Sequence, residues 1–597
     1  MARNVAEFIW KRLSEWGLSR VYGYPGDGVG GLDVALEKAR DFMHYTQVPH
    51  EEMAAFMATA HAKFTGQVGL CYATSGPGAI HLLTGLYDAK ADHVPVVAIV
   101  GQQARSALGA SYQQEVDLQN LFKDVASEYV MTAVVPEQVR TVIDRAVRIA
   151  RARRCVTTVI LPNDLQLLPY EDPPMAHGAT HTGVGFPGES LVPEAASLQR
   201  VADILNQGRK VAMLVGAGAL QATDEVIAVA ERLQAGIAKA LLGKCAVPDD
   251  LPFVTGSIGL LGTKPSWDLM QECDTLLMVG SAFPYSEFLP KPGQARGVQI
   301  DIDGTNLSLR YPMEYSVVGD SRATLAALLP LLEQKPTGGA WRKTIADNLA
   351  EWWKVLEARA LTSAEPINPQ RVFWELSPLL PDDVIMTGDS GSVANWYARD
   401  IRIRRGMMGS LSGGLASLGA ATPYAVAAKI AHPHRPVIGF IGDGAMQMNG
   451  LNVMITVGKY WKEWSDPRFI MMVLNNEDLN QVTWEERVQL GEGKTPSTQT
   501  IPDFPYARYA GLVGLKGIYC DDPDRVADAW KEALASDRPV ILEFKTDPNV
   551  PPLPPHITFK DAKNFMTMMA DEPELGSVLK NSVKEIIATV LPGKKAG

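Results

Sequence analysis

The sequence predicts an α/β protein built from three tandem, doubly wound parallel-sheet domains. Short apolar runs such as VPVVAIVG, VAMLVGAG, TLLMVG, PVIGFIGDG and FIMMVLNN alternate with helix-like stretches, which is typical of parallel sheets covered by helices. The chain has 597 residues, and a single hydrophobic core stops growing well below that size. Segments rich in Pro and Gly at 169–194 and near 333–341 divide it into three blocks of similar size.

The composition is that of an ordinary globular protein and argues against several other classes. A net charge of −11 disfavours nonspecific nucleic-acid binding, and no apolar run approaches the length of a membrane span. The stretch MARNVAEFIWKRLSEWG predicts an amphipathic first helix and, with Glu7 and Glu15, does not resemble a signal peptide. The five cysteines are scattered without a C-x-x-C pair, which predicts reduced thiols in a cytoplasmic protein.

One predicted strand end carries an acid between two glycines. The apolar run ending at Gly442 predicts a buried strand, and Asp443 and Gly444 follow at its carboxyl end. A second apolar run ends in Asn475 and Asn476. Carboxylate and amide oxygens are ligands for Mg²⁺ or Ca²⁺, and Gly444 opens the loop to a phosphate group. Each end alone could be an ordinary turn, but together they predict a metal-bridged diphosphate site.

Three parallel-sheet domains in a row predict a large cofactor, or two cofactors, held between them. Ligands of open parallel sheets bind outside the carboxyl ends of the strands. A nucleotide-binding dehydrogenase is the alternative that this pattern leaves open. The stretch VGAGALQATDEV, however, lacks a full G-x-G-x-x-G opening, and a partial match is weak evidence.

The G-D-G and N-N pair resembles the metal motif of the thiamine diphosphate enzyme superfamily. Its spacing is a few residues longer than usual, and the insertion-like stretch KYWKEWSDPR at 459–468 accounts for the difference. The resemblance implies that Asp443 and Asn476 are side-chain ligands of Mg²⁺ and that Asp478 contributes its backbone carbonyl. It also implies that Glu51, in QVPHEEMAAF, favours the imino tautomer of the cofactor's pyrimidine ring and so activates the cofactor. An acidic first turn of a helix is the alternative reading of Glu51.

The resemblance extends to the pyruvate oxidase group, which includes quinone-linked pyruvate dehydrogenases and is related to acetolactate synthase. It is carried by MAAFMATAHAKFTGQVGLCYATSGPGAIHLLTGLYDAKADHVPVVAIVGQ, GSAFPYSEFLP, VQIDIDGTNLSLR, PYARYAGLVGLKGI and LPPHITFKDAKNF. It implies a pyrimidine-binding domain at 1–168, a central Rossmann-like FAD-type domain at 192–334, a diphosphate- and Mg²⁺-binding domain at 366–552, and a tail with an amphipathic helix at 553–597.

The same resemblance assigns residues to sites. Expected FAD contacts are Gly216, Gly218, Gly280, Ser281, Phe283, Asp301, Asp303, Gly319 and Asp320. Expected thiamine diphosphate contacts are Gly26, Gly388, Asp389, Ser390, Ser412, Gly413, Leu418, Gly442, Gly444 and Ala445. Gln114 and Glu485 match active-site positions of the family. Some relatives keep the central domain without flavin chemistry, so a central domain with no redox role is the alternative.

Three positions depart from the pattern. Oxidases of the group have aromatic residues where this chain has Gln113 and Gln481, and relatives usually have Arg in place of Pro49. Two amides in place of two rings predict a wetter, more hydrogen-bonding pocket. The leading expectation is oxidative decarboxylation of a 2-oxo acid, with pyruvate first among the candidates, and electron transfer to FAD. The alternatives are a nonoxidative decarboxylase, an acetolactate synthase-like carboligase, or a binding protein on a degenerate enzyme fold.

The C-terminal tail predicts an amphipathic helix. Its apolar stripe consists of Leu579, Val583, Ile586, Ile587 and Val590. Quinone-linked relatives use such a helix to reach a membrane, so peripheral contact with the inner face of the membrane is one expectation. Packing on its own domain or on a neighbouring subunit is the other. By resemblance the active site lies between two subunits, which implies a homodimer or homotetramer.

Overall fold

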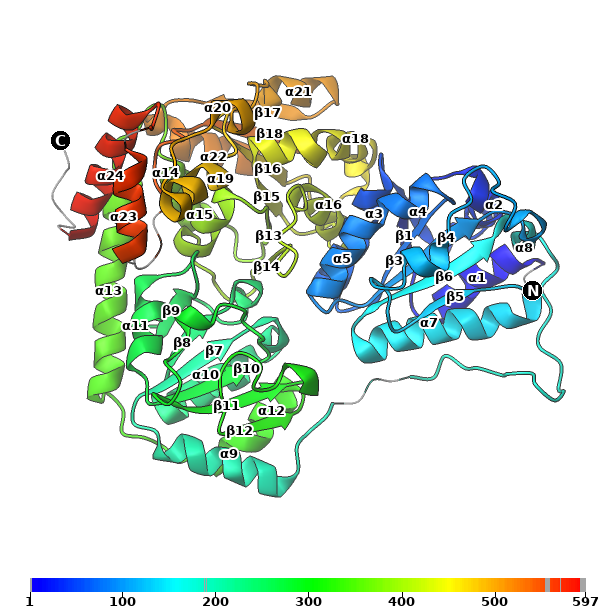
Figure 1. Cartoon of the computed structure of the whole chain (residues 1–597), viewed down its shortest axis with the longest axis horizontal. Coiled ribbons are helices and arrows are strands. Elements are labelled where there is room, and N and C mark those ends of the chain that lie inside the picture. The colour runs from blue at the N-terminus through cyan, green and yellow to red at the C-terminus, as the bar shows by residue number, and fades with distance from the viewer. Residues whose placement is uncertain are drawn as a thin grey trace.

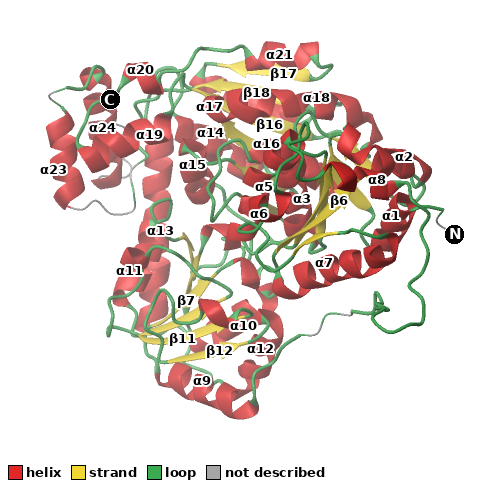
Figure 2. Ribbon diagram, turned by 45° about the vertical axis from the view of Figure 1, so that its right-hand side comes forward, coloured by secondary structure: helices red, strands yellow, loops and turns green. Residues whose placement is uncertain are grey.

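The predicted α/β class and its three parallel sheets are confirmed. The computed structural model describes residues 3–186, 188, 190–552, 554, 559–569 and 571–590. Figure 1 shows three lobes in chain order, and each contains a sheet of six strands with flanking helices (Figures 1 and 2). Every pairing between these strands is parallel.

The first sheet has the strand order β2-β1-β3-β4-β6-β5. Its strands are β1 (Arg20–Gly23), β2 (His44–Gln47), β3 (Gly69–Ala73), β4 (Val96–Gln102), β5 (Val130–Thr132) and β6 (Val156–Pro162). Its helices are α1 (Val5–Glu15), α2 (Gly30–Lys38), α3 (Glu51–Thr65), α4 (Pro77–His81), α5 (Leu83–Ala91), α6 (Leu118–Leu121), α7 (Val139–Arg153) and α8 (Asn163–Gln166). The His50 side chain caps α3, which ends at the left-handed Gly66.

The central sheet has the order β12-β11-β10-β7-β8-β9. Its strands are β7 (Val211–Val215), β8 (Gly236–Lys239), β9 (Val254–Ser257), β10 (Thr275–Val279), β11 (Arg296–Asp301) and β12 (Tyr315–Val318). Its helices are α9 (Ala195–Gln207), α10 (Thr223–Leu233), α11 (Lys264–Glu272) and α12 (Ser321–Leu328). The long helix α13 (Ala340–Ala360) then runs from this lobe to the third (Figure 1).

The third sheet has the order β14-β13-β15-β16-β18-β17. Its strands are β13 (Ile385–Gly388), β14 (Met408–Leu411), β15 (Val437–Gly442), β16 (Phe469–Asn475), β17 (Lys516–Cys520) and β18 (Val540–Lys545). Its helices are α14 (Pro369–Leu376), α15 (Ser392–Asp400), α16 (Ala421–Ala431), α17 (Asp443–Ala445), α18 (Leu451–Tyr460), α19 (Asn480–Glu485), α20 (Pro496–Gln499), α21 (Tyr506–Leu512) and α22 (Val526–Leu534).

Each sheet reverses its strand order beside its first strand in the sequence. These points of reversal lie between β1 and β3, between β7 and β10, and between β13 and β15. Doubly wound sheets bind ligands beside such a point, outside the carboxyl ends of the strands. Gly26 follows β1, Gly216 follows β7, and Asp443 follows β15. The residues that the sequence assigns to cofactors therefore cluster at all three switch points.

One hydrophobic core joins the first and third lobes through α3 and α16, which lie side by side in Figure 1. Phe56 and Tyr424 meet edge to face with ring centroids 6.4 Å apart, and the Tyr424 hydroxyl donates to the buried Asp88. Lys63 reaches both the Leu411 carbonyl and Asp92. The two lobes therefore share a core within one chain.

The Pro/Gly-rich segment at 169–194 lies along the first lobe. Its described residues contain no helix or strand. The Thr182 carbonyl accepts from Arg12, and Arg12 forms a bidentate pair with the buried Asp144. Phe186 lies under the guanidinium groups of Arg148 and Arg151. The segment is therefore attached to α1 and α7 rather than free in solvent.

The C-terminal helices are α23 (Phe559–Met568) and α24 (Leu575–Val590). Helix α24 buries its polar side: Glu585 faces Arg359 of α13 at 3.5 Å, and Asn581 donates to Asp547. The predicted stripe turns outward, and its exposed members are Val583, Ile586, Ile587 and Val590. The helix therefore packs on its own chain, as one of the two expectations had it, but through its polar side and not through the apolar stripe. The two lysines that follow this helix in the sequence, Lys594 and Lys595, lie outside the described residues.

Within the described residues, no helix combines the length and apolar character needed to cross a membrane. All five cysteines are described, and none forms a disulfide. Cys71, Cys273 and Cys520 are buried.

Candidate active site

The carboxyl ends of β15 and β16 bring Asp443 and Asn476 together. These strands are neighbours in register, with Gly442 opposite Leu474. Asp443 Oδ2 accepts the backbone N–H groups of Asn476 and Glu477 at 2.8 and 2.6 Å, and Oδ1 accepts that of Gly444 at 2.8 Å. Two residues 33 positions apart are thereby joined at one edge of the sheet.

Asp443 is a buried acid without a cation. Burial raises the pKa of Asp443 to about 6, although the three amide hydrogen bonds act to lower it. Among the described residues, no lysine, arginine or histidine forms an ion pair with it. A carboxylate has about four lone-pair sites, and three are used by amides, so one remains on Oδ1. A divalent cation at this oxygen would neutralise the charge.

The residues next to Asp443 offer further oxygen atoms that could bind the same cation. Asn476 Oδ1 accepts the Asp478 N–H at 3.1 Å. The Asp478 carboxylate is directed elsewhere, because it pairs with Lys494 at 3.2 Å and accepts from Thr483 at 3.0 Å. Asp478 could therefore contribute only its backbone carbonyl to a metal, as the resemblance implies. Ala445 is buried behind the loop.

Open space adjoins the loops after β13 and β15. No atom lies within 4 Å of a Cβ added to Gly442 or to Gly391, and Gly391 has a φ of 97° that favours glycine. Gly388, at the end of β13, has only ordinary contacts. A Cβ on Gly444, in contrast, would come 2.6 Å from the Leu479 side chain. The backbone on both sides of the switch point is thus uncovered, which suits a diphosphate group.

Asp389 is fully buried and holds the loop that carries Leu418. Its two oxygens accept the N–H groups of Gly419 and Ala421, each at 2.9 Å. Burial raises the pKa of Asp389 to about 7 against the effect of these bonds. Leu418 is half-buried against the core shared by the first and third lobes. The Asp389 carboxylate therefore positions a loop and does not face the open space.

The remaining predicted thiamine diphosphate contacts of the third lobe belong to the same loops. Ser390 Oγ donates to the Ser417 carbonyl at 3.3 Å, and Ser412 Oγ accepts the Ser417 N–H at 2.9 Å. The Gly413 N–H donates to Asp92 of the first lobe at 3.0 Å. These bonds fix the 412–418 loop from both sides.

Glu51 begins α3 and is 8% exposed. Its Oε2 lies 2.9 Å from His81 Nδ1, and the His81 ring stacks on that of His50 at 4.3 Å. A Cβ on Gly78 would come 3.0 Å from Glu51 Oε1, so this glycine leaves room beside the carboxyl group. His81 could not be identified from the sequence, because no local pattern links it to a residue 30 positions earlier.

Gln114 lies over the loop that borders Glu51. It has a left-handed φ of 61°, and its Oε1 accepts from Ser75 Oγ at 3.2 Å. A Cβ on Gly76 would come 2.8 Å from the Gln114 side chain. A Cβ on Gly26 would come 2.5 Å from that of Thr74 at the start of the same loop. The structure therefore brings Gln114, Gly26 and Glu51 around one loop of the first sheet.

Glu485 ends α19, just beyond the metal-site loop. Its Oε1 accepts from Gln481 Nε2 at 2.9 Å, and Gln481 Oε1 accepts from Asn395 Nδ2 of α15 at 3.0 Å. A π-helical turn, Glu486–Leu490, follows Glu485, and such turns are frequent at functional sites. The buried Arg487 in that turn pairs with Glu572, which attaches the C-terminal helices to this region.

The glycines predicted to bind FAD make close backbone contacts at the central switch point. A Cβ on Gly216 would come 2.4 Å from the Gly280 oxygen, and one on Gly218 would come 2.7 Å from Gly280 Cα. The Gly218 N–H donates to the Gly280 carbonyl at 3.0 Å. Ser281 and Phe283, which follow β10, are buried. The absence of side chains thus lets the loops after β7 and β10 touch.

The acids predicted near FAD also have partners within the protein. Asp320 caps α12 by accepting the Ala323 N–H at 2.8 Å, and Asp303 accepts the Thr305 N–H at 2.9 Å. Asp301 accepts the Asp303 N–H at 2.9 Å, and burial raises the pKa of Asp301. A Cβ on Gly319 would come 3.0 Å from Pro193.

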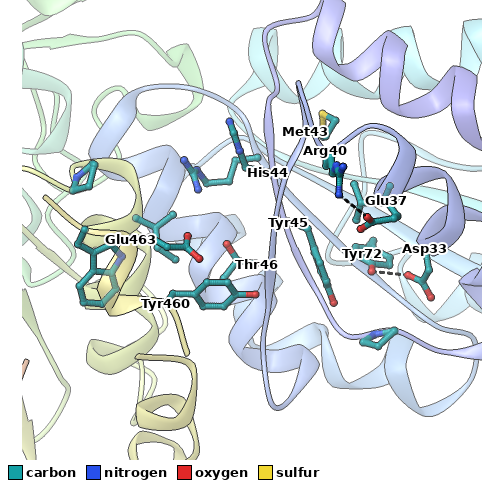
Figure 3. Close-up of a pocket in the computed structure, with 16 residues that line it drawn as sticks. Asp33, Glu37, Arg40, Met43, His44, Tyr45, Thr46, Tyr72, Tyr460 and Glu463 are labelled. Carbon is teal, nitrogen blue, oxygen red and sulfur yellow. Dashed lines mark hydrogen bonds and ion pairs between the residues drawn. The ribbon is translucent and has the colours of Figure 1, made fainter. Parts of the chain in front are cut away.

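None of these predicted site residues lines a cavity of about 580 Å³ between the first and third lobes. Figure 3 shows it around the edge strand β2, with Tyr45 and Asp33 on one side and Tyr460 and Glu463 on the other. The Gln47 N–H of β2 donates to the Tyr460 hydroxyl at 3.0 Å. The 459–468 stretch, interpreted as an insertion, thus forms one wall of this cavity and does not enter the predicted cofactor site.

Comparisons with known proteins agree with this geometry. Three family models match: the thiamine pyrophosphate enzyme N-terminal binding domain at residues 3–121, its central domain at 198–328, and its C-terminal binding domain at 389–544. A Bacillus subtilis (strain 168) protein, YdaP, whose name describes it as thiamine pyrophosphate-containing, is 34% identical over 95% of this chain and 96% of its own.

Two further relatives have more specific names. Pyruvate oxidase of Lactiplantibacillus plantarum is 31% identical over 90% of this chain and 87% of its own. The large subunit of acetolactate synthase isozyme 3 of Escherichia coli (strain K12) is 29% identical over 90% of this chain and 93% of its own. Together with the three domain models, these similarities show that the chain belongs to the thiamine pyrophosphate enzyme family.

Proposed function

We propose that this chain is a Mg²⁺-dependent thiamine diphosphate enzyme that decarboxylates a 2-oxo acid, pyruvate first among the candidates, and passes the electrons to FAD. The observation that carries the proposal is the buried, cation-free Asp443 beside Asn476 at the β13/β15 switch point. A metal ion would neutralise the charge of Asp443, and a diphosphate group bound to that ion would occupy the open space next to it.

Each residue has a defined task in this proposal. Asp443, Asn476 and the Asp478 carbonyl hold Mg²⁺, and the uncovered backbone at Gly391 and Gly442 receives the diphosphate. When bound, thiamine diphosphate supplies an electron sink for the pair of electrons released as CO₂ leaves. Glu51 shares a proton with the pyrimidine ring from a site nearly closed to water. His81 orients the Glu51 carboxyl group.

The FAD part of the proposal rests on the likeness to pyruvate oxidase and on the surface of the central sheet. Three exposed apolar side chains follow the strand ends there: Leu260 after β9, Tyr285 after β10 and Ile302 after β11. Tyr285 packs edge to face on the buried Phe283 at 5.6 Å. Apolar groups left in solvent at the carboxyl ends of a parallel sheet suit a flat aromatic cofactor.

A nonoxidative decarboxylase or a carboligase is the second candidate. It is favoured by the internal partners of the residues predicted to bind FAD and by the likeness to acetolactate synthase. We also propose an assembly of at least two subunits. The hydrogen-bond partners described for the Glu51 side chain lie in the first lobe and those of Asp443 in the third, so a second copy would complete the site.

The test is an anaerobic absorbance spectrum of the purified protein with thiamine diphosphate and Mg²⁺, recorded before and after addition of pyruvate. The proposal predicts a flavin band that bleaches. A flavin band that persists while a panel of 2-oxo acids is turned over would favour the nonoxidative candidate. Absence of any flavin band would overturn the FAD part and leave the thiamine diphosphate part standing.

A further inference from the structure

Gln481 connects the two loops that border the proposed diphosphate site. It lies in α19, which follows the metal-site loop, and it bonds to Glu485 at 2.9 Å on the same helix. Its other end bonds to Asn395 of α15, which follows the open turn at Gly391. Asn395 is 2% exposed, so this end of the connection is fixed by packing.

The chemistry of Glu485 fixes the orientation of both amides. An ionised carboxylate only accepts hydrogen bonds, so Gln481 must turn its NH₂ group toward Glu485. Its carbonyl oxygen then faces Asn395, which must donate from Nδ2. The second hydrogen on Asn395 Nδ2 points to the Ser392 carbonyl at 3.3 Å. Only one orientation of the Gln481 and Asn395 amide groups is therefore consistent with these hydrogen bonds.

Two hydrogen-bonding groups remain unused beside each other. Gln481 Nε2 has a second hydrogen, and Glu485 keeps its Oε2. Within the described part of the chain, Gln481 is the only hydrogen-bond partner of the Glu485 side chain, and Glu485 forms no ion pair. A donor next to an acceptor is complementary to a hydroxyl group, which accepts from the amide and donates to the carboxylate. In the single chain Glu485 is exposed and Gln481 half-buried, so water can pair both groups. Once a bound substrate excludes that water, a methyl group would leave both unpaired.

We propose that Gln481 is a specificity-determining residue that, together with Glu485, selects a 2-oxo acid bearing a hydroxyl group on its side chain. The inference rests on the proposed function, because it needs the substrate to lie between α15 and α19, and it replaces pyruvate as the first candidate with a hydroxylated 2-oxo acid. Sites built to bond a substrate hydroxyl discriminate strongly against the analogue that lacks it. An aromatic residue at this position, as in the oxidases, would offer neither group.

The test compares 3-hydroxypyruvate with pyruvate, which differ by one hydroxyl group, on the enzyme loaded with thiamine diphosphate and Mg²⁺. The measured quantity is the ratio of their kcat/KM values. The wild type should favour the hydroxylated acid by at least about 10-fold. Gln481→Met keeps the length of the side chain and removes both hydrogen bonds, and it should bring the ratio to within about 2-fold of one.

The control is Gln489→Met, the same substitution on an exposed residue of the following turn, and it should leave the ratio unchanged. Asn395→Leu removes the bond that orients the Gln481 amide, together with the longer bond to the Ser392 carbonyl, and should lower the ratio partly. A wild-type ratio of one or less, or an undiminished ratio in Gln481→Met, would overturn the inference. In either case, turnover of a 2-oxo acid would still support the proposed function. Failure to turn over any 2-oxo acid, despite thiamine diphosphate binding by calorimetry, would overturn both.

Discussion

The carboxyl ends of the third and central sheets carry the same kinds of residue, but the two sheets use them differently. Both place glycines and acids after parallel strands. At the third sheet, Asp443 has no cation partner among the described residues, and open space adjoins Gly442. At the central sheet, Gly218 touches Gly280, and Asp320 caps a helix. A glycine or an acid at a strand end therefore indicates a ligand site only when no other part of the protein packs against the glycine or neutralises the acid.

The difference also separates the two cofactors. The third-sheet switch point supplies its own evidence for a metal-bound diphosphate, because a buried charge needs a counterion there. At the central switch point, the predicted residues already satisfy one another, so FAD is supported by exposed apolar side chains and by similarity. The predictions below alter one side of this comparison at a time.

The largest effect is expected from Glu51→Gln. This change removes the proton that Glu51 would share with the pyrimidine ring and preserves the shape of the side chain. Turnover should fall by about 10²- to 10⁴-fold, and thiamine diphosphate affinity should change little. Steady-state kinetics and calorimetry measure the two quantities. Glu52→Gln, in the same helical turn, is the control and should retain activity. Full activity in Glu51→Gln would sink the assignment.

Asp443→Asn should separate cofactor binding from folding. Without the carboxylate, Mg²⁺-dependent affinity for thiamine diphosphate should fall by at least about 100-fold. The cofactor-free variant should still fold but lose about 1–3 kcal/mol of unfolding free energy, because the amide NH₂ group would face a backbone N–H that the carboxylate accepts in the wild type. Calorimetric titration and thermal unfolding check both. Unchanged Mg²⁺ dependence would place the metal elsewhere.

Two glycine substitutions should have opposite consequences. Gly218→Ala would bring a Cβ 2.7 Å from the Gly280 backbone and should destabilise the protein by about 1–3 kcal/mol without changing thiamine diphosphate affinity. Gly442→Ala meets no protein atom within 4 Å, so stability should change by less than about 0.5 kcal/mol while affinity falls. If Gly442→Ala destabilised the protein and left affinity intact, the comparison would be wrong.

Asp389 should give the third sheet a pH-dependent stability. Its folded-state pKa of about 7 lies above the unfolded value of about 3.9, so between these values the native state retains a proton that the unfolded state loses. The contribution of Asp389 to the free energy of unfolding therefore falls as the pH rises toward 7. Relative to Asp389→Asn, the wild type should lose about 1–3 kcal/mol of unfolding free energy as the pH is raised from 5 to 8.

Asp303→Asn is the matched control for this pH dependence. Partial burial acts to raise the pKa of Asp303, but the hydrogen bonds from Thr305 outweigh it and hold the pKa below its usual range. Asp303 is therefore ionised in both states from pH 5 to pH 8, and its variant should show no such trend. Thermal unfolding at several pH values measures both. Parallel curves for Asp389→Asn and the wild type would contradict the assignment.

The sequence predicts the architecture and the strand ends of the site well. Alternating apolar runs locate the strands, and Asp443 and Asn476 stand out because both follow buried runs. It could not predict the pairing of His81 with Glu51, or that Asp389 binds the backbone of a loop. Nor could it predict the inward polar face of α24, where Thr589 bonds to Arg359, 230 positions earlier. Such partners meet only through tertiary packing, which local periodicity does not encode.

The most direct test of the central claim is a calorimetric titration of the purified protein with thiamine diphosphate, with and without Mg²⁺. The account predicts one binding event per chain that depends on Mg²⁺ and is lost in Asp443→Asn. Absence of binding, or binding that is equally strong without Mg²⁺ and in the variant, would contradict it.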